Sequence, residues 1–246
     1  MTIVDKNPRF RIVLLSSLVI VALGILVSLG AWQLQRKAWK EALIAQLDAR
    51  SKMPTLSLDQ AYSLWKQSPD TIEFRHVSVS GIYDHTSERH LISAQAQGAG
   101  WQIITPLLTS ELQHVLVLRG IVPDPLKNPQ TRLQSQPTMP VVLKTRVRLS
   151  ELRTNFTPDN QPAKNSWYWR DGEALRASVS VPQGYEHMPF FLEALEPSSQ
   201  WPKPDPTGIN IRNSHLMYAL TWFGLALTLV GVYGVMIWRA LYPPQQ

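Results

Sequence analysis

A histidine at the start of a long uncharged stretch is the residue of this chain most suited to chemistry. His215 lies one position before a run from Leu216 to Trp238 that contains no charged side chain. At helical spacing, Tyr218 and Trp222 fall on the same face as His215. That face could hold a flat, partly apolar ligand, with an imidazole nitrogen of His215 bound to its metal. Alternatively, His215 is an interfacial hydrogen-bonding anchor and the two aromatic residues belong to a membrane aromatic belt, and spacing alone favours this second interpretation.

Other catalytic and metal-binding patterns are missing from the sequence. It contains no Gly-x-Ser-x-Gly, no His-Glu-x-x-His, no phosphate-binding glycine loop and no Gly-x-Gly-x-x-Gly after a strand, so we expect a protein that is not an enzyme. A membrane-anchored hydrolase would need serine, histidine and an acid gathered in a pocket. His85 and His90 could form a two-histidine metal site, but no third ligand stands at a recognisable spacing. The absence of cysteine excludes disulfides, thiolate metal sites and the attachment motif of c-type haem.

Two uncharged runs, one near each end, predict two membrane-spanning helices. A bilayer core of about 30 Å needs roughly 20 apolar residues in a helix. The first run, Ile12 to Leu34, exceeds the apolar core of about 7 to 15 residues that is typical of a cleaved signal peptide, so an uncleaved anchor is predicted. The expected division of the chain is a flank at 1–11, a span at 12–34, a large domain at 35–213, a second span at 214–239 and a tail at 240–246.

Small residues within both spans predict faces on which another helix could pack closely. In the first span, Gly24 and Ser28 are four positions apart. In the second, Gly224, Thr228 and Gly231 form a thin face. Small residues are also frequent in membrane helices in general, so this pattern alone identifies no partner.

The first span is followed by a collar of aromatic, amide and basic residues suited to lipid headgroups, comprising Trp32, Gln33, Arg36, Lys37, Trp39 and Lys40. Alanine and leucine then keep helical propensity high as far as Met53-Pro54, where the proline ends the pattern. We therefore expect one helix to continue through the collar.

The net charge of +6 suggests an anionic partner, either a membrane surface or nucleic acid. The basic residues are scattered, and Arg170 is the only one next to the aromatic group Trp167-Tyr168-Trp169. Because stacking platforms for bases interleave aromatic with basic residues, we expect the lipid bilayer and not nucleic acid. The basic residues flanking the two spans do not decide the orientation, and both termini are placed in the cytoplasm.

The middle of the chain predicts strands with a few short helices. Ser57 to Gln67 has the apolar stripe of a helix, and Gly172 to Ala177 is a second short helix. Period-two or apolar runs bounded by turn residues predict strands at 76–83, 90–94, 101–107, 115–121, 141–149, 166–169, 190–194 and 209–211. The stretches 123–140, 157–166 and 197–208 are rich in proline or polar residues and should be exposed loops or extended linkers. The fold class is thus an α+β membrane protein, with two transmembrane helices flanking a mainly antiparallel β domain that has a few short helices.

Several segments together resemble the Surfeit-locus (Surf1/Shy1-type) family of cytochrome c oxidase assembly factors. They are Gly30 to Lys40, Glu73 to Asp84, Gly100 to Leu107, Val115 to Pro123, Asn165 to Asp171 and Asn213 to Ala226, in family order across nearly the whole chain. The chain departs from the family pattern at Ile121, where an aromatic residue usually follows Arg-Gly.

The resemblance implies a protein of a bacterial-type inner membrane, with the β-rich domain on the periplasmic side. It also implies a role in delivering or inserting haem a into the catalytic subunit of an aa3-type oxidase, with other oxidase assembly factors or haem a synthase as further partners. The haem-contacting histidine of the family maps onto His215, which favours the ligand interpretation and makes Tyr218 and Trp222 candidate walls of a haem site. A haem-independent scaffold that binds oxidase subunits or other assembly factors is the alternative.

Overall fold

The computed structural model describes residues 8–95, 98–204 and 213–242 of the chain. It divides into a unit of two long helices and a β-rich unit within residues 46–210, which we call the β domain. The predicted strand at 209–211 lies outside the described residues. The two units are described separately below.

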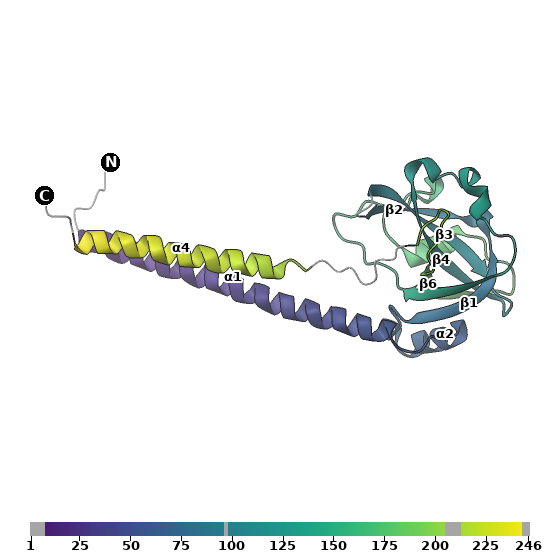
Figure 1. Cartoon of the computed structure of the whole chain (residues 1–246), viewed down its shortest axis with the longest axis horizontal. Helices are drawn as coiled ribbons and strands as arrows, with labels where there is room; N and C mark the ends of the chain where they lie inside the picture. Colours follow the sequence, from purple (N-terminus) through teal and green to yellow (C-terminus); the bar gives the residue numbers. More distant parts are fainter. Residues whose placement is uncertain (1–7, 96–97, 205–212, 243–246) are drawn as a thin grey trace. The chain divides into compact units, whose positions relative to one another are not determined.

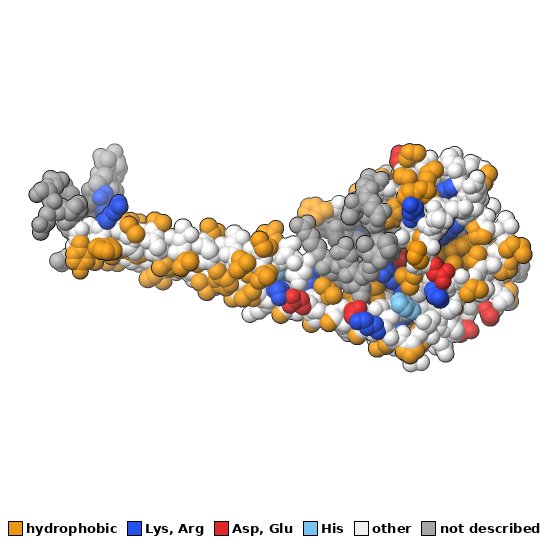
Figure 2. Space-filling model, in the orientation of Figure 1, with side chains coloured by type: hydrophobic (Ala, Val, Ile, Leu, Met, Phe, Trp, Pro, Cys, Tyr) orange, Lys and Arg blue, Asp and Glu red, His pale blue; other side chains and the backbone are white. Residues whose placement is uncertain are grey.

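The helical unit consists of α1 (Pro8–Ser51) and α4 (His215–Leu241), which lie side by side (Figure 1). Both helices are long and apolar enough to cross a membrane. Hydrophobic side chains cover the visible face of the two helices for most of their length (Figure 2), and large ones such as Ile20, Leu227 and Trp238 are more exposed than buried. Surfaces of this kind favour a lipid environment over water. As predicted, α1 runs on through the collar, and it ends shortly before Pro54.

The predicted helix after Pro54 is confirmed as α2 (Leu58–Gln67), and its start is fixed by a capping box. The hydroxyl of Ser57 accepts a hydrogen bond from the backbone N–H of Gln60, and the Gln60 side chain accepts one from the N–H of Ser57. Leu58 and Ala61 are buried, as the apolar stripe predicts. A short 3₁₀ turn, η1 (Pro69–Thr71), follows.

Five of the six described strands form a closed barrel, and the sixth pairs at its side. The six are β1 (His76–Tyr83), β2 (Arg89–Gln95), β3 (Gly98–Leu108), β4 (Gln113–Pro123), β5 (Val141–Arg148) and β6 (Glu186–Ala194). The order is β1-β5-β6-β4-β3, the ring closes between β3 and β1, and β2 pairs with β3. The pairs are antiparallel except β4 with β6, so the predicted mainly antiparallel domain is confirmed.

Closure of the barrel depends on a close approach of β1 to β3. Ile82 and Tyr83 pair with Leu108 and Leu107 there. A Cβ atom at Gly81 would lie 2.5 Å from the carbonyl oxygen of Leu108, so a side chain at this position would push the two strands apart. The ring therefore closes where the sequence supplies a glycine.

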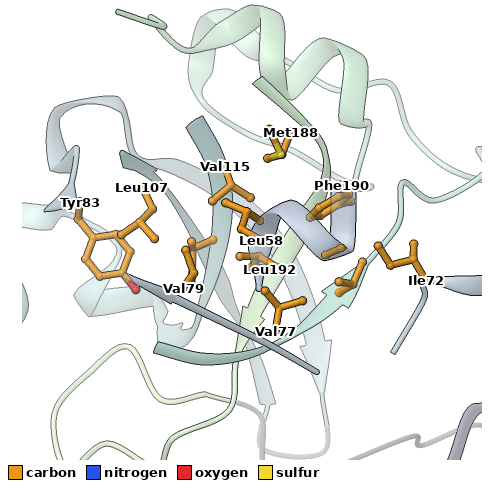
Figure 3. Close-up of a cluster of buried hydrophobic side chains, with 13 residues drawn as sticks. Leu58, Ile72, Val77, Val79, Tyr83, Leu107, Val115, Met188, Phe190 and Leu192 are labelled. Carbon is orange, nitrogen blue, oxygen red and sulfur yellow. The ribbon is translucent and has the colours of Figure 1, made fainter. Parts of the chain in front are cut away.

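The strict alternation predicted for β1 places one set of side chains in the barrel core. Val77, Val79, Gly81 and Tyr83 are buried, whereas the alternating residues Ser78, Ser80 and Ile82 are exposed. The buried side chains point toward those of Leu107 and Leu192, which come from other strands (Figure 3). A second apolar cluster on β2, β3, β4 and β6 packs against the predicted helix α3 (Gly172–Ser178). The ring of Trp167 belongs to this cluster.

The strand predicted at 166–169 does not form. Ser166 and Trp167 make isolated bridges to Gln161 and Leu91, and Trp167 is fully buried. The physical reason is a competing side-chain acceptor: the carboxamide oxygen of Asn160 accepts hydrogen bonds from the backbone N–H groups of Tyr168 and Trp169. These donors are therefore not available for a strand ladder.

The loop predicted to be exposed at 123–140 is ordered and partly buried. It contains η3 (Asp124–Leu126) and η4 (Pro129–Ser135), and the side chain of Arg132 is buried. The remaining 3₁₀ turns are η2 (His85–Ser87) and η5 (Pro162–Lys164). Proline and glutamine content predicts the lack of strands here, but it does not reveal that an arginine from this loop enters the protein.

Candidate functional site

The start of α4 presents its histidine to α1. Positions spaced alternately by four and three residues, namely His215, Ala219, Trp222 and Ala226, form the face of α4 that contacts α1. Ala219 and Ala226 are buried, and His215 and Trp222 are partly buried. Two small alanines on this face allow the helices to approach closely.

At Gly30, the backbone of α1 lies close against the ring of Phe223 on α4. A Cβ atom there would lie 2.6 Å from ring atoms of Phe223, so only glycine fits without a shift. Gly24, Gly224 and Gly231 have nothing within 4 Å of such an atom. The small-residue faces predicted from the sequence are therefore not the faces through which α1 and α4 meet. The glycine that the contact requires is Gly30, because the ring of Phe223 packs against it.

A hydrogen bond between the two helices orients the imidazole of His215. Its Nδ1 atom lies 2.7 Å from Oε1 of Gln33 on α1. A carboxamide oxygen accepts hydrogen bonds, so Nδ1 of His215 carries the proton and donates it. In the neutral ring the lone pair then belongs to Nε2. The contact thus selects the tautomer whose Nε2 carries the lone pair that can bind a metal. Histidines at metal sites are commonly held in this way, with the other ring nitrogen donating to an oxygen of the protein.

The aromatic residues predicted beside His215 take two different places. Trp222 lies on the face that contacts α1 and is partly buried. Tyr218 lies on the edge of that face and is 56% exposed. His215 and Trp222 are therefore both partly buried on the face toward α1, whereas most of the Tyr218 side chain is exposed.

Gln33 is the site residue that sequence reasoning missed, because it was assigned to the headgroup collar. One signal could have found it. When two spans flank a single domain, the end of the first and the start of the second lie on the same side of the membrane, and Gln33 and His215 occupy these two positions. The collar itself contains a stack in which the Arg36 guanidinium lies 5.8 Å and 5.4 Å from the ring centroids of Trp32 and Trp39.

The histidines of the β domain make different contacts. Nε2 of His90 lies 2.8 Å from a carboxylate oxygen of Glu88, which also accepts hydrogen bonds from the Arg132 guanidinium, and all three side chains are buried. Burial acts to raise the pKa of Glu88, but the hydrogen bonds from His90 and Arg132 outweigh it and lower that pKa. Nε2 of His85 donates to the carbonyl oxygen of Pro137 at 3.1 Å. In the described part of the chain, no three histidine or acidic side chains are grouped as metal ligands.

The buried His114 and the partly buried His187 form a pair on the neighbouring strands β4 and β6. Their ring centroids are 4.3 Å apart, and both nitrogens of His114 and Nε2 of His187 lack a hydrogen-bond partner. Burial lowers the pKa of His114, and burial together with the nearby His114 and Arg176 lowers the pKa of His187 to about 3. Both rings are therefore neutral at physiological pH.

Comparison with known proteins finds one family model, described as the SURF1 family, that matches residues 20–227. The chain is 34% identical to Surfeit locus protein 1 of Mus musculus, over 80% of this chain and 67% of that protein. It is 34% identical to Surfeit locus protein 1 of Homo sapiens, over 80% and 69%. It is also 34% identical to a SURF1-like protein of Monosiga brevicollis, over 82% and 79%.

Proposed function

This chain belongs to the SURF1 family, and on that premise we propose that it is a non-enzymatic assembly factor for an aa3-type cytochrome c oxidase. Its proposed task is to help deliver haem a to, or insert it into, the catalytic subunit of the oxidase. It acts from a bacterial-type inner membrane, with both termini cytoplasmic and the β domain periplasmic. Other oxidase assembly factors or haem a synthase are the further partners expected.

The observation that carries the proposal is the hydrogen bond between Gln33 and His215. It leaves Nε2 of His215 unprotonated and, among the described residues, without a hydrogen-bond partner, which is what an axial ligand of haem iron requires. His215 would therefore hold the iron, and Tyr218 and Trp222 would pack on the macrocycle. Bound haem would supply an iron that accepts a nitrogen ligand, and it would give the protein a visible absorption spectrum.

The position of the site suits a carrier better than a permanent holder. It lies at the end of a helix with strongly apolar surroundings, and the farnesyl tail of haem a favours the bilayer over water. A single histidine ligand makes a bond that can be released more easily than a clamp of two histidines. Release is necessary if the cofactor is to pass to the oxidase.

The test is the haem content of the full-length protein purified from cells that make haem a. We expect an absorption spectrum of haem a in the parent protein and its loss in His215→Ala. His76→Ala, which removes a histidine from the β domain, is the matched control and should retain the parent spectrum. Equal haem content in His215→Ala and the parent would show that His215 is not the axial ligand.

A haem-independent scaffold that binds oxidase subunits is the second candidate. The observation that favours it is in the β domain, where Leu152 and Phe156 are 93% and 97% exposed and could contact a protein partner. This candidate predicts that the oxidase subunit co-purifies with both the parent and His215→Ala, and that neither preparation contains haem.

A further inference from the structure

The β domain contains a pocket of about 390 Å³, lined by both polar and apolar residues that all belong to this domain. Strands β1, β4 and β5 contribute Tyr83, Arg119 and Lys144 to its lining, and residues 196–204 cross it. Arg119 comes from the middle of β4, where its side chain is partly buried.

The contacts that the Arg119 guanidinium makes are with neutral groups. Its Nη2 donates to the carbonyl oxygen of Ser135, its Nη1 lies 3.4 Å from Nδ1 of His85, and its Cζ lies 4.7 Å from the ring centroid of Tyr83. Because Nε2 of His85 donates to a carbonyl, its Nδ1 is an acceptor and the ring is neutral. Burial lowers the pKa of His85 and raises the pKa of Tyr83 to about 12, so neither group supplies a charge opposite to that of arginine.

The nearby acidic groups are already paired. Glu88 binds Arg132 and His90, so its charge is offset by its own partners. Glu196 lies at the pocket rim, 3.8 Å from the ammonium of Lys144, and both side chains are mostly exposed. Among the residues that the structure describes, no carboxylate is within ion-pairing distance of Arg119. Burying a guanidinium without a counter-charge is costly, so the pocket base carries an unbalanced positive charge.

The pocket lining also contains apolar residues, beside polar ones such as Gln134 and Gln200. The apolar residues include Pro137, Leu143, Ala194, Trp201 and Pro202. A ligand that fits must combine an anionic group for the guanidinium with an apolar body for these apolar residues. The planar fork of a guanidinium matches a carboxylate in geometry.

We propose that this pocket is a binding site for a small organic carboxylate, whose anionic group pairs with Arg119 and Lys144 and whose apolar body lies against Trp201. The proposal is independent of the haem assignment, because the pocket and its residues belong to the β domain alone. It adds a ligand site to the part of the protein that otherwise has a structural or scaffolding role.

The test uses the full-length protein in detergent micelles and the probe 4-(trifluoromethyl)benzoate, observed by ¹⁹F NMR against protein-free micelles. We expect the benzoate signal to broaden with the protein, and the uncharged analogue 4-(trifluoromethyl)benzamide to behave as in empty micelles. Arg119→Gln should weaken binding by about tenfold or more, as for loss of a charged hydrogen bond. Benzoate and benzamide that bind equally well would overturn the proposal.

A second variant keeps the test decisive if Arg119→Gln does not fold. Lys144 is at the exposed rim, so Lys144→Glu should leave the fold intact and weaken benzoate binding by at least about twofold through repulsion. Lys164→Gln, an exposed charge outside the pocket, is the control and should have no effect. Unchanged binding in Lys144→Glu, or displacement of benzoate by inorganic phosphate at equal concentration, would contradict a site built for carboxylates.

Discussion

A buried ion network in the β domain and the histidine of the helical unit differ in how much of their hydrogen-bonding capacity the fold uses. In the β domain, carboxylates such as Glu88 and Glu193 are enclosed by arginines, and their hydrogen-bonding capacity is consumed within the fold. In the helical unit, His215 makes one neutral hydrogen bond to Gln33, and its second nitrogen has no hydrogen-bond partner among the described residues. The buried ion network is therefore a structural device, whereas a partly satisfied group such as this imidazole keeps capacity for a ligand.

The largest effect should come from breaking the ion network. Glu88→Gln leaves the buried guanidinium of Arg132 without its counter-charge, so we expect a loss of about 3–5 kcal/mol in the free energy of unfolding. Chemical denaturation of the full chain would measure it. Asp48→Asn, in the exposed pair with Lys52, is the control and should cost less than about 1 kcal/mol. Similar losses for both variants would mean that burial does not distinguish the two pairs.

The next effect concerns the contact between α1 and α4. Gly30→Leu places a side chain where the ring of Phe223 lies, so overpacking of about 1–3 kcal/mol should separate the helices. Helix pairing can be measured by the yield of an engineered disulfide, Ser16→Cys with Tyr233→Cys, because these two side chains are in contact. The chain has no cysteine of its own to compete. Gly24→Ala, at an open position, should leave the yield unchanged. A yield equally high in both variants would place the helix contact elsewhere.

A third prediction isolates the orienting role of Gln33. Gln33→Ala removes the acceptor of the Nδ1 proton, and we expect haem affinity to fall about tenfold while some haem remains, in contrast to His215→Ala. Gln33→Glu keeps an acceptor and should retain binding close to that of the parent. Haem titration followed by absorbance would compare the three. If Gln33→Ala binds haem as tightly as the parent, the hydrogen bond does not prepare the ligand.

The smallest effect is a pH dependence of the β domain. The folded-state pKa of His187 is about 3 and that of His114 is also lowered, whereas an unfolded histidine titrates near 6.5. The unfolded chain therefore binds more protons as pH falls below 6.5, so stability is full above that pH and declines toward pH 3. Each group contributes at most about 1.4 kcal/mol per pH unit.

Urea unfolding at several pH values between 6.5 and 4.5 would measure this slope, since carboxylates with a lowered pKa act mainly below that range. His187→Phe should make the slope shallower but not flat, because burial also lowers the pKa of His76 and His85. Two charged groups also act on these histidines: Asp84 raises the pKa of His114, and Arg176 lowers the pKa of His187. A slope unchanged in His187→Phe would show that this ring is not buried in its neutral form.

Much of the local structure could be predicted from the sequence. Alternation predicted the buried face of β1, the apolar stripe and the serine before it predicted α2, and uninterrupted apolar runs predicted α1 and α4. The failures share one cause. The sequence predicted a strand for Trp167 and an exposed loop for Arg132. Their actual positions depend on partners far along the chain, Leu91 and Glu88.

The sequence by itself determined the element types, the two apolar helices and the membership in the SURF1 family, since periodicity, composition and motif order are local or linear properties of the chain. The tertiary structure was needed to show that Gln33 meets His215 across 182 positions, that Gly30 and not Gly24 is the close contact, and that Arg119 has no counter-charge among the described residues. Each of these depends on which faces meet and which partners are already engaged. Spacing marks a residue as able to bind, and its neighbours in the fold decide which of its atoms remain free to do so.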